Sequence, residues 1–139
     1  SLENKYLRIS EEYLKISEEN MDEALQNHTS LYAFFGAVLA HAKKTYNKAD
    51  ISFEYAEAEA KEERRESFSS KGKKSTEGAL SAYVLTLPHL RDLRSEVLES
   101  QHKYNLAKNI ITSLDHQKDM LVQMSANKRA EIKMVSDLG

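Results

Sequence analysis

The stretch Ala58–Lys74, AEAKEERRESFSSKGKK, is where a long helical pattern ends and where basic residues gather. From Lys61 to Lys74 the chain has six basic and three acidic residues, a local charge of +3. The first 28 residues have three basic and seven acidic residues, a charge of −4, although the whole chain carries only −2. A basic patch beside an aromatic side chain is what a polyanion-binding surface needs. The other interpretation is a solvated helix end that is merely rich in lysine.

The bulk composition predicts one helical domain over residues 1–139. Glycine is scarce, there is one proline, and Ala, Glu, Lys, Leu and Ser dominate, which favours helices. The absence of cysteine excludes disulfides and thiolate chemistry and fits a reducing, cytoplasmic location. The longest apolar run, 31–40, is well short of the roughly 20 residues of a membrane span. We therefore expect no membrane partner.

Apolar residues recur at steps of three and four along the first half of the chain, which is typical of amphipathic helices. We expect an N-terminal helix over about 1–28 and a long helix over 29–70. A bend or break is expected between Ile16 and Thr29, with Asn27 or Thr29 as the cap of the second helix.

The segment 71–87 is expected to hold a basic turn and a short helix. Gly72 suits the end of the long helix, and Ser75 or Thr76 can cap the short one. Pro88 fits the first turn of a last long helix over 88–135, where its missing N–H costs nothing.

The last helix has apolar residues at most positions of two heptad series, which predicts a coiled-coil-like stripe. The fold class predicted is all-α, an elongated helical hairpin of two long helices joined by a short helix. Such a hairpin has little interior of its own, and large exposed apolar stripes usually face partners. We therefore expect a homo-oligomer that assembles through these stripes. The residues assigned to oligomerisation are Val97, Tyr104, Ile111, Leu114 and Leu121.

Catalytic and metal-binding patterns do not emerge from the sequence. The five histidines have no metal-ligand spacing with one another or with acids. The run Gly72–Thr76 lacks the earlier glycine and the preceding strand of a phosphate-binding loop. Neighbouring glutamates on a helix point apart and do not form an acid–base couple. The protein is predicted to be a non-enzyme without a cofactor or metal.

The helix end Lys61–Ser69, the Lys/Gly-rich break after it and the long C-terminal helical segment resemble the UvsY family of phage recombination mediators. Arg64 followed by Phe68 falls at the family's spacing. Glu62 stands where the family has a lysine, and Ser67 stands at the first of its paired aromatic positions. Further matching positions are Thr76–Ala79, Pro88, Gln117–Leu121 and Arg129–Glu131.

The resemblance implies a small helical protein that forms a closed ring, heptameric in the best-known case, and binds single-stranded DNA. Such proteins help a RecA-like recombinase displace the single-strand-binding protein and load as a filament during DNA recombination and repair. For a phage-encoded chain it implies the bacterial host cytoplasm. Phe68, with Tyr55 as a helper, is expected to stack on a base, and the cations are expected to contact phosphates. The DNA-binding residues predicted are Lys61, Arg64, Arg65, Phe68, Lys71, Lys73 and Lys74.

Two other functions stay open at this point. The heptad stripes alone suit a structural or adaptor coiled coil, such as a scaffold or secretion-stalk protein, which needs no nucleic acid. The Met- and Tyr-bearing stripe of the last helix, with Met120 and Met124, also suits a chaperone groove for a secreted or capsid protein.

Overall fold

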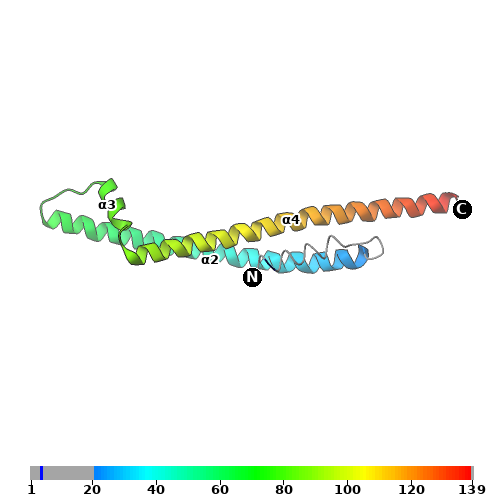
Figure 1. Ribbon diagram of the computed structural model, residues 1–139, viewed down its shortest axis with the longest axis horizontal. Helices are drawn as coiled ribbons and strands as arrows, with labels where there is room; N and C mark the ends of the chain where they lie inside the picture. Colours follow the sequence, from blue (N-terminus) through cyan, green and yellow to red (C-terminus); the bar gives the residue numbers. More distant parts are fainter. Residues whose placement is uncertain (1–3, 5–20, 139) are drawn as a thin grey trace. The chain divides into compact units, whose positions relative to one another are not determined.

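The computed structural model describes residue 4 and residues 21–138. These residues form the long helix α2 (Met21–Ser70), the short helix α3 (Glu77–Val84) and the long helix α4 (Pro88–Leu138) (Figure 1). No strand occurs in this part of the chain. The predicted all-α fold of two long helices joined by a short one is confirmed.

Helix α2 starts earlier than the sequence pattern suggested. It begins at Met21 and continues through Asn27 and Thr29, so the prediction that either residue caps a new helix is wrong. The Thr29 hydroxyl donates instead to the carbonyl of Leu25 at 3.0 Å, a bond within the helix. Most of the predicted N-terminal helix, including the stretch around Ile16, lies outside the described residues.

The turn after α2 has the geometry predicted for it. Gly72 has a positive φ of 68°, which is unstrained only for glycine. The amide of Lys73 donates to the carbonyl of Phe68 at 2.8 Å, and that of Gly72 to the carbonyl of Ser69 at 3.0 Å. This nested pair of bonds is the Schellman motif that ends many helices. The basic turn therefore has a defined backbone.

Helices α3 and α4 also begin at the predicted residues. The Thr76 hydroxyl accepts from the amide of Ala79 at 3.2 Å and so caps α3. Pro88 is the first residue of α4, where a helix needs no N–H donor.

The contacts of the described chain fall into two compact units. The first unit takes the described residues up to Ala40 and those from Asn105 onward. Its core consists of Ala24, Phe35, Ile110, Leu114 and Leu121. The buried His28 adds a polar contact, in which its Nε2 lies 2.6 Å from the carbonyl oxygen of Leu114 and the ring N–H donates.

The second unit takes His41–Tyr104 and includes α3 and the basic turn. Its buried cluster is smaller, with Ala60, Val84 and Leu90 at the centre and Phe53 packed against it. As the α2 partner moves from Tyr46 to Ala60, the α4 partner moves back from Tyr104 to Leu90, so the helices run antiparallel here.

The apolar stripe assigned to oligomerisation packs inside the chain. Leu114 and Leu121 have no exposed surface and Val97 is 8% exposed. Tyr104 stacks on Tyr46 with ring centroids 5.8 Å apart, and Ile111 packs against the core of the first unit. Val97, Leu114 and Leu121 are therefore covered within one chain, whereas Tyr104 and Ile111 are half-buried, and the assignment of these residues to contacts between subunits stays a prediction. Helical periodicity shows that a face is buried, but not whether the partner is another helix of the same chain.

Candidate nucleic-acid interface

Three lysines of the basic turn present free ammonium groups. Lys71, Lys73 and Lys74 are all exposed, and none forms an ion pair with any residue that the structure describes. The ten residues from Ser67 to Thr76 hold these lysines and no acidic residue. The Schellman motif fixes the backbone from Phe68 to Lys73 and Lys74 follows directly, so the three lysines belong to one short turn.

Lys61 and Arg65, predicted to contact DNA, are held by acidic side chains. Lys61 Nζ lies 2.9 Å from Glu77 Oε1 and 3.3 Å from Glu57 Oε1. Arg65 Nη2 lies 3.1 Å from Glu77 Oε2, and its Nη1 lies 3.2 Å from Glu62 Oε2. The sequence predicted six cations open to phosphate, whereas two of them are neutralised within the fold.

The ion pairs shift the ionisation of the groups that form them. The hydrogen bond from Lys61, followed by its charge and the bond from Arg65, lowers the pKa of Glu77 below its ordinary value of 4.5. The hydrogen bond to Glu77 is in turn the main reason why the pKa of Lys61 is raised above 10.5, with Glu57 adding to it. Near neutral pH the two side chains therefore carry opposite charges.

Arg64 and Phe68, the pair at the core of the family resemblance, contact each other. The guanidinium carbon of Arg64 lies 4.7 Å from the centre of the Phe68 ring and 4.4 Å from that of Tyr83 on α3. Its Nε is buried and has no hydrogen-bond partner among the described residues, so the two rings orient it. Phe68 is half-buried, and a ring already covered by a guanidinium offers less surface for stacking on a base.

Tyr55, predicted as a second stacking residue, lies in acidic surroundings. Its side chain is 74% exposed. It lines a surface hollow together with four glutamates, Glu54, Glu57, Glu59 and Glu62, and with Lys61 and Arg65. The two cations are paired with carboxylates, so the hollow keeps an excess of negative charge, which disfavours DNA at Tyr55 while those ion pairs hold.

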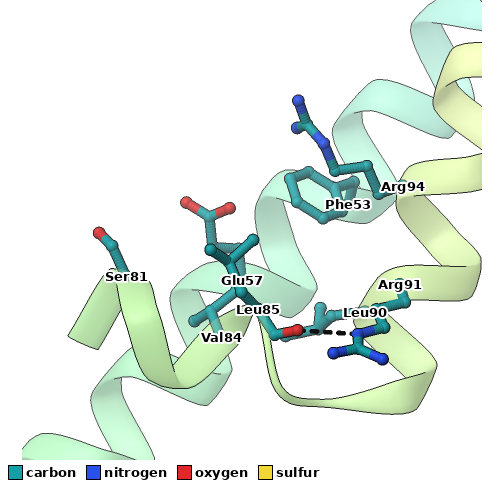
Figure 2. A pocket seen from close by; sticks show the side chains of 8 residues that line it. All are labelled: Phe53, Glu57, Ser81, Val84, Leu85, Leu90, Arg91 and Arg94. Atoms are coloured by element: carbon teal, nitrogen blue, oxygen red, sulfur yellow. Dashed lines mark hydrogen bonds between the residues drawn. The ribbon is translucent and has the colours of Figure 1, made fainter. Parts of the chain in front are cut away.

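A second hollow of about 170 Å³ lies between α2, α3 and the start of α4 (Figure 2). Its walls are mainly apolar, from Phe53, Val84 and Leu90. Of the two arginines at its edge, Arg91 donates from Nε to the carbonyl of Leu85 at 2.9 Å, and Arg94 lies over the Phe53 ring at 5.6 Å. The hollow can take an apolar side chain, and Glu57 and Ser81 add polar groups to its lining.

Two residues of the interface were missed by the sequence analysis. No role was predicted for Tyr83, because nothing in its spacing along the sequence indicates a contact with Arg64. Glu77 directly follows the cap of α3, and a carboxylate there is normally explained by the helix dipole alone. The contact of Glu77 with Lys61 and Arg65 depends on the path of the turn.

Other chemistry is sparse in this part of the chain. No group of three His, Asp or Glu side chains is arranged to hold a metal ion among residues 21–138. Within the same range no helix is both long and apolar enough to cross a membrane. Comparison of the chain with protein-family models, with curated proteins and with solved structures finds no match in any of the three.

Proposed function

We propose that this protein binds single-stranded DNA through the basic turn and acts as a recombination mediator, which helps a RecA-like recombinase displace a single-strand-binding protein and load. The observation that carries the proposal is the group of three lysines, Lys71, Lys73 and Lys74, exposed and without an acidic partner in the described structure. The resemblance of Arg64–Phe68 to the UvsY family supports the same function.

The contacts proposed are to phosphates and therefore independent of sequence. Lysine offers a point charge with three rotatable donors, which suits an irregular, flexible strand. Arg64 makes no ion pair with the residues described, and its contact with the Phe68 and Tyr83 rings places its charge beside the turn. Arg64 and the three lysines of the turn give each protein chain four cations, which form only a weak site for DNA.

Self-association would strengthen the site, because each added copy brings another patch to the same strand without new contact chemistry. Because most of the predicted apolar stripe is covered within one chain, we assign self-association to other residues. The last turns of α4 expose Ile132, Met134, Val135 and Leu138 by 61–87%. We propose that these side chains pack between copies in a homo-oligomer, with a ring as the arrangement that the family resemblance favours.

The direct test is the affinity for a fluorescent single-stranded oligonucleotide, measured by anisotropy over a range of salt concentrations. The triple variant Lys71→Ala/Lys73→Ala/Lys74→Ala should bind more weakly. Its slope of log K against log salt should fall by about 2, since each phosphate contact with a single strand contributes about 0.7.

A matched control removes three other exposed lysines of the second unit, Lys43, Lys44 and Lys48. Both triple variants lose the same charge, so a long-range effect of net charge changes both alike. The proposal expects the control to keep the salt slope of the unaltered protein. Equal weakening of the two variants, or no change in the turn variant, contradicts the proposed interface.

The mediator step needs a separate measurement. The DNA-dependent ATP hydrolysis of a RecA-like recombinase is followed on an oligonucleotide already coated with single-strand-binding protein. The unaltered protein should shorten the lag before hydrolysis, and the turn variant should not. A protein that binds DNA without shortening the lag is a DNA-binding protein of another kind.

The second candidate is a structural or adaptor coiled coil without nucleic-acid binding. It is favoured by the ion pairs of Lys61 and Arg65, which neutralise two of the predicted DNA-binding cations. It predicts no change in anisotropy even at low salt, together with an oligomer whose mass is unaffected by the oligonucleotide.

A further inference from the structure

Glu77 is the only residue in the described structure whose carboxylate pairs with two of the predicted DNA-binding cations. One oxygen takes a hydrogen bond from Lys61 Nζ at 2.9 Å, and the other takes one from Arg65 Nη2 at 3.1 Å. Two donors that reach the two oxygens of one anion form an arrangement equally suited to a phosphate group. The carboxylate thus stands where a phosphate of a bound strand would be held.

We propose that Glu77 competes with DNA phosphate for Lys61 and Arg65, so that it limits the affinity of the site. This inference rests on the proposed binding of single-stranded DNA. Lys61 and Arg65 belong to one face of α2, four residues apart, whereas Glu77 reaches them from the start of α3. The turn with Lys71, Lys73 and Lys74 connects α2 to α3. The competing carboxylate of Glu77 therefore belongs to the same short segment as these three lysines.

The contact is weak enough to respond to a polyanion. The side chain of Glu77 is 65% exposed and that of Arg65 is 44% exposed, whereas that of Lys61 is 16% exposed. The pair of Glu77 with Arg65 is therefore screened by salt and contributes little to stability, and the pair with Lys61 is screened less. Glu77 therefore lowers the affinity of the site for DNA without blocking it. Removing the Glu77 charge should add two cations to the surface that a strand can contact.

Lys61 and Arg65 keep partial neutralisation without Glu77. Glu57 lies 3.3 Å from Lys61, and Glu62 lies 3.2 Å from Arg65, both within one turn of α2. Because each cation stays close to one carboxylate of its own helix, the gain is smaller than that of two isolated charges. We expect one to two new phosphate contacts, which steepen the salt slope by about 0.7–1.4.

The test compares Glu77→Gln with Glu66→Gln in the same oligonucleotide assay. Glutamine preserves the size of Glu77, and Thr76 still caps α3. Glu66 is exposed, follows Arg65 directly and forms no ion pair in the described structure, so its substitution changes the net charge by the same amount. We expect tighter binding and a steeper salt slope for Glu77→Gln than for Glu66→Gln.

A second pair of variants assigns the gain to the two cations. Lys61→Ala/Arg65→Ala leaves Glu57, Glu62 and Glu77 without their cations and so weakens binding at long range, but it should leave the salt slope nearly unchanged while Glu77 is present, because neither cation then contacts a phosphate. In the Glu77→Gln protein the same double substitution should remove the gain, which is the non-additivity expected of groups in one network. Circular dichroism melting curves check that the variants keep the helical fold.

The outcomes separate this inference from the function on which it rests. If the unaltered protein binds the oligonucleotide and both glutamine variants behave alike, Glu77 has no special role and only this inference fails. Weaker binding by Glu77→Gln has the same meaning. If neither the unaltered protein nor Glu77→Gln binds at low salt, the proposed function fails, and the inference fails with it.

Discussion

The first unit of the fold and the second unit differ in the kind of side chain that holds their helices together. In the first unit Phe35, Ile110, Leu114 and Leu121 are completely buried. In the second unit Leu80 and Leu90 are also buried, but α2 contributes only the small Ala60 to the buried cluster, and arginine–aromatic contacts and ion pairs around Arg64 and Glu77 add to it.

This difference suits a mainly structural role for the first unit and the proposed DNA-binding role for the second unit. Large buried side chains contribute several kcal/mol each and leave little on the surface to bind a ligand. Small residues and exposed ion pairs contribute little to stability, but they leave charges at the surface where a partner can reach them. We therefore expect substitutions in the first unit to act on stability, and those near the turn to act on binding.

The largest effect is expected from Leu114→Ala in the first unit. Leu114 is fully buried, so the truncation leaves a cavity and should lower the free energy of unfolding by about 2–5 kcal/mol. Leu98 lies on the same helix in the second unit and is 54% exposed, so Leu98→Ala should change that free energy by less than about 0.5 kcal/mol. Urea denaturation measures both, and equal losses would show that the burial of Leu114 adds no stability.

A smaller effect in the first unit is expected from His28→Ala. The His28 side chain is 3% exposed and donates to the carbonyl of Leu114, linking α2 to α4. Loss of a buried hydrogen bond should lower the free energy of unfolding by about 1–3 kcal/mol. His41→Ala, at an exposed position of α2, is the control and should change it by less than about 0.5 kcal/mol. Indistinguishable melting curves for the two variants would mean that the buried contact adds no stability.

The glycines of the second unit offer a pair of substitutions with opposite signs. Gly72 has a φ of 68°, so Gly72→Ala strains the turn and should cost about 1–2 kcal/mol. Gly78 lies in α3 with open space where a Cβ would be, so Gly78→Ala should stabilise by about 0.4–1 kcal/mol. Thermal unfolding gives both values. A stabilising Gly72→Ala would show that the turn is less fixed than its hydrogen bonds indicate.

Local signals made most of the backbone predictable. Gly72, Thr76 and Pro88 each act through the residues beside them, and each lies at the helix boundary that the sequence predicted. The start of α2 was missed, because Asn27 and Thr29 can cap a helix but here lie within one. Asn and Thr side chains can form hydrogen bonds with the backbone both at a helix cap and within a helix.

The candidate site was less predictable, because its electrostatics depend on contacts between helices. Lys61 and Arg65 looked free in the sequence, since Glu77 is 16 and 12 residues away. Only the path of the turn brings that carboxylate to them. The heptad stripe was recognised correctly as buried surface, but the sequence could not tell a neighbouring helix of the same chain from another subunit. Leu114 and Leu121 are fully buried in a single chain.

The smallest effect expected is the pH dependence of the Glu77 contact. The pKa of Glu77 is lowered in the folded protein, so its contribution to stability is complete above the ordinary value of 4.5 and is lost as the pH falls through the lower folded value. The pKa of Lys61 is raised, so its contribution is complete below 10.5 and is lost as the pH rises through the higher folded value. The difference in melting temperature between the unaltered protein and Glu77→Gln should therefore be constant between these limits and shrink outside them. If the difference in melting temperature instead shrinks near pH 7, a group other than Glu77 and Lys61 controls the contact.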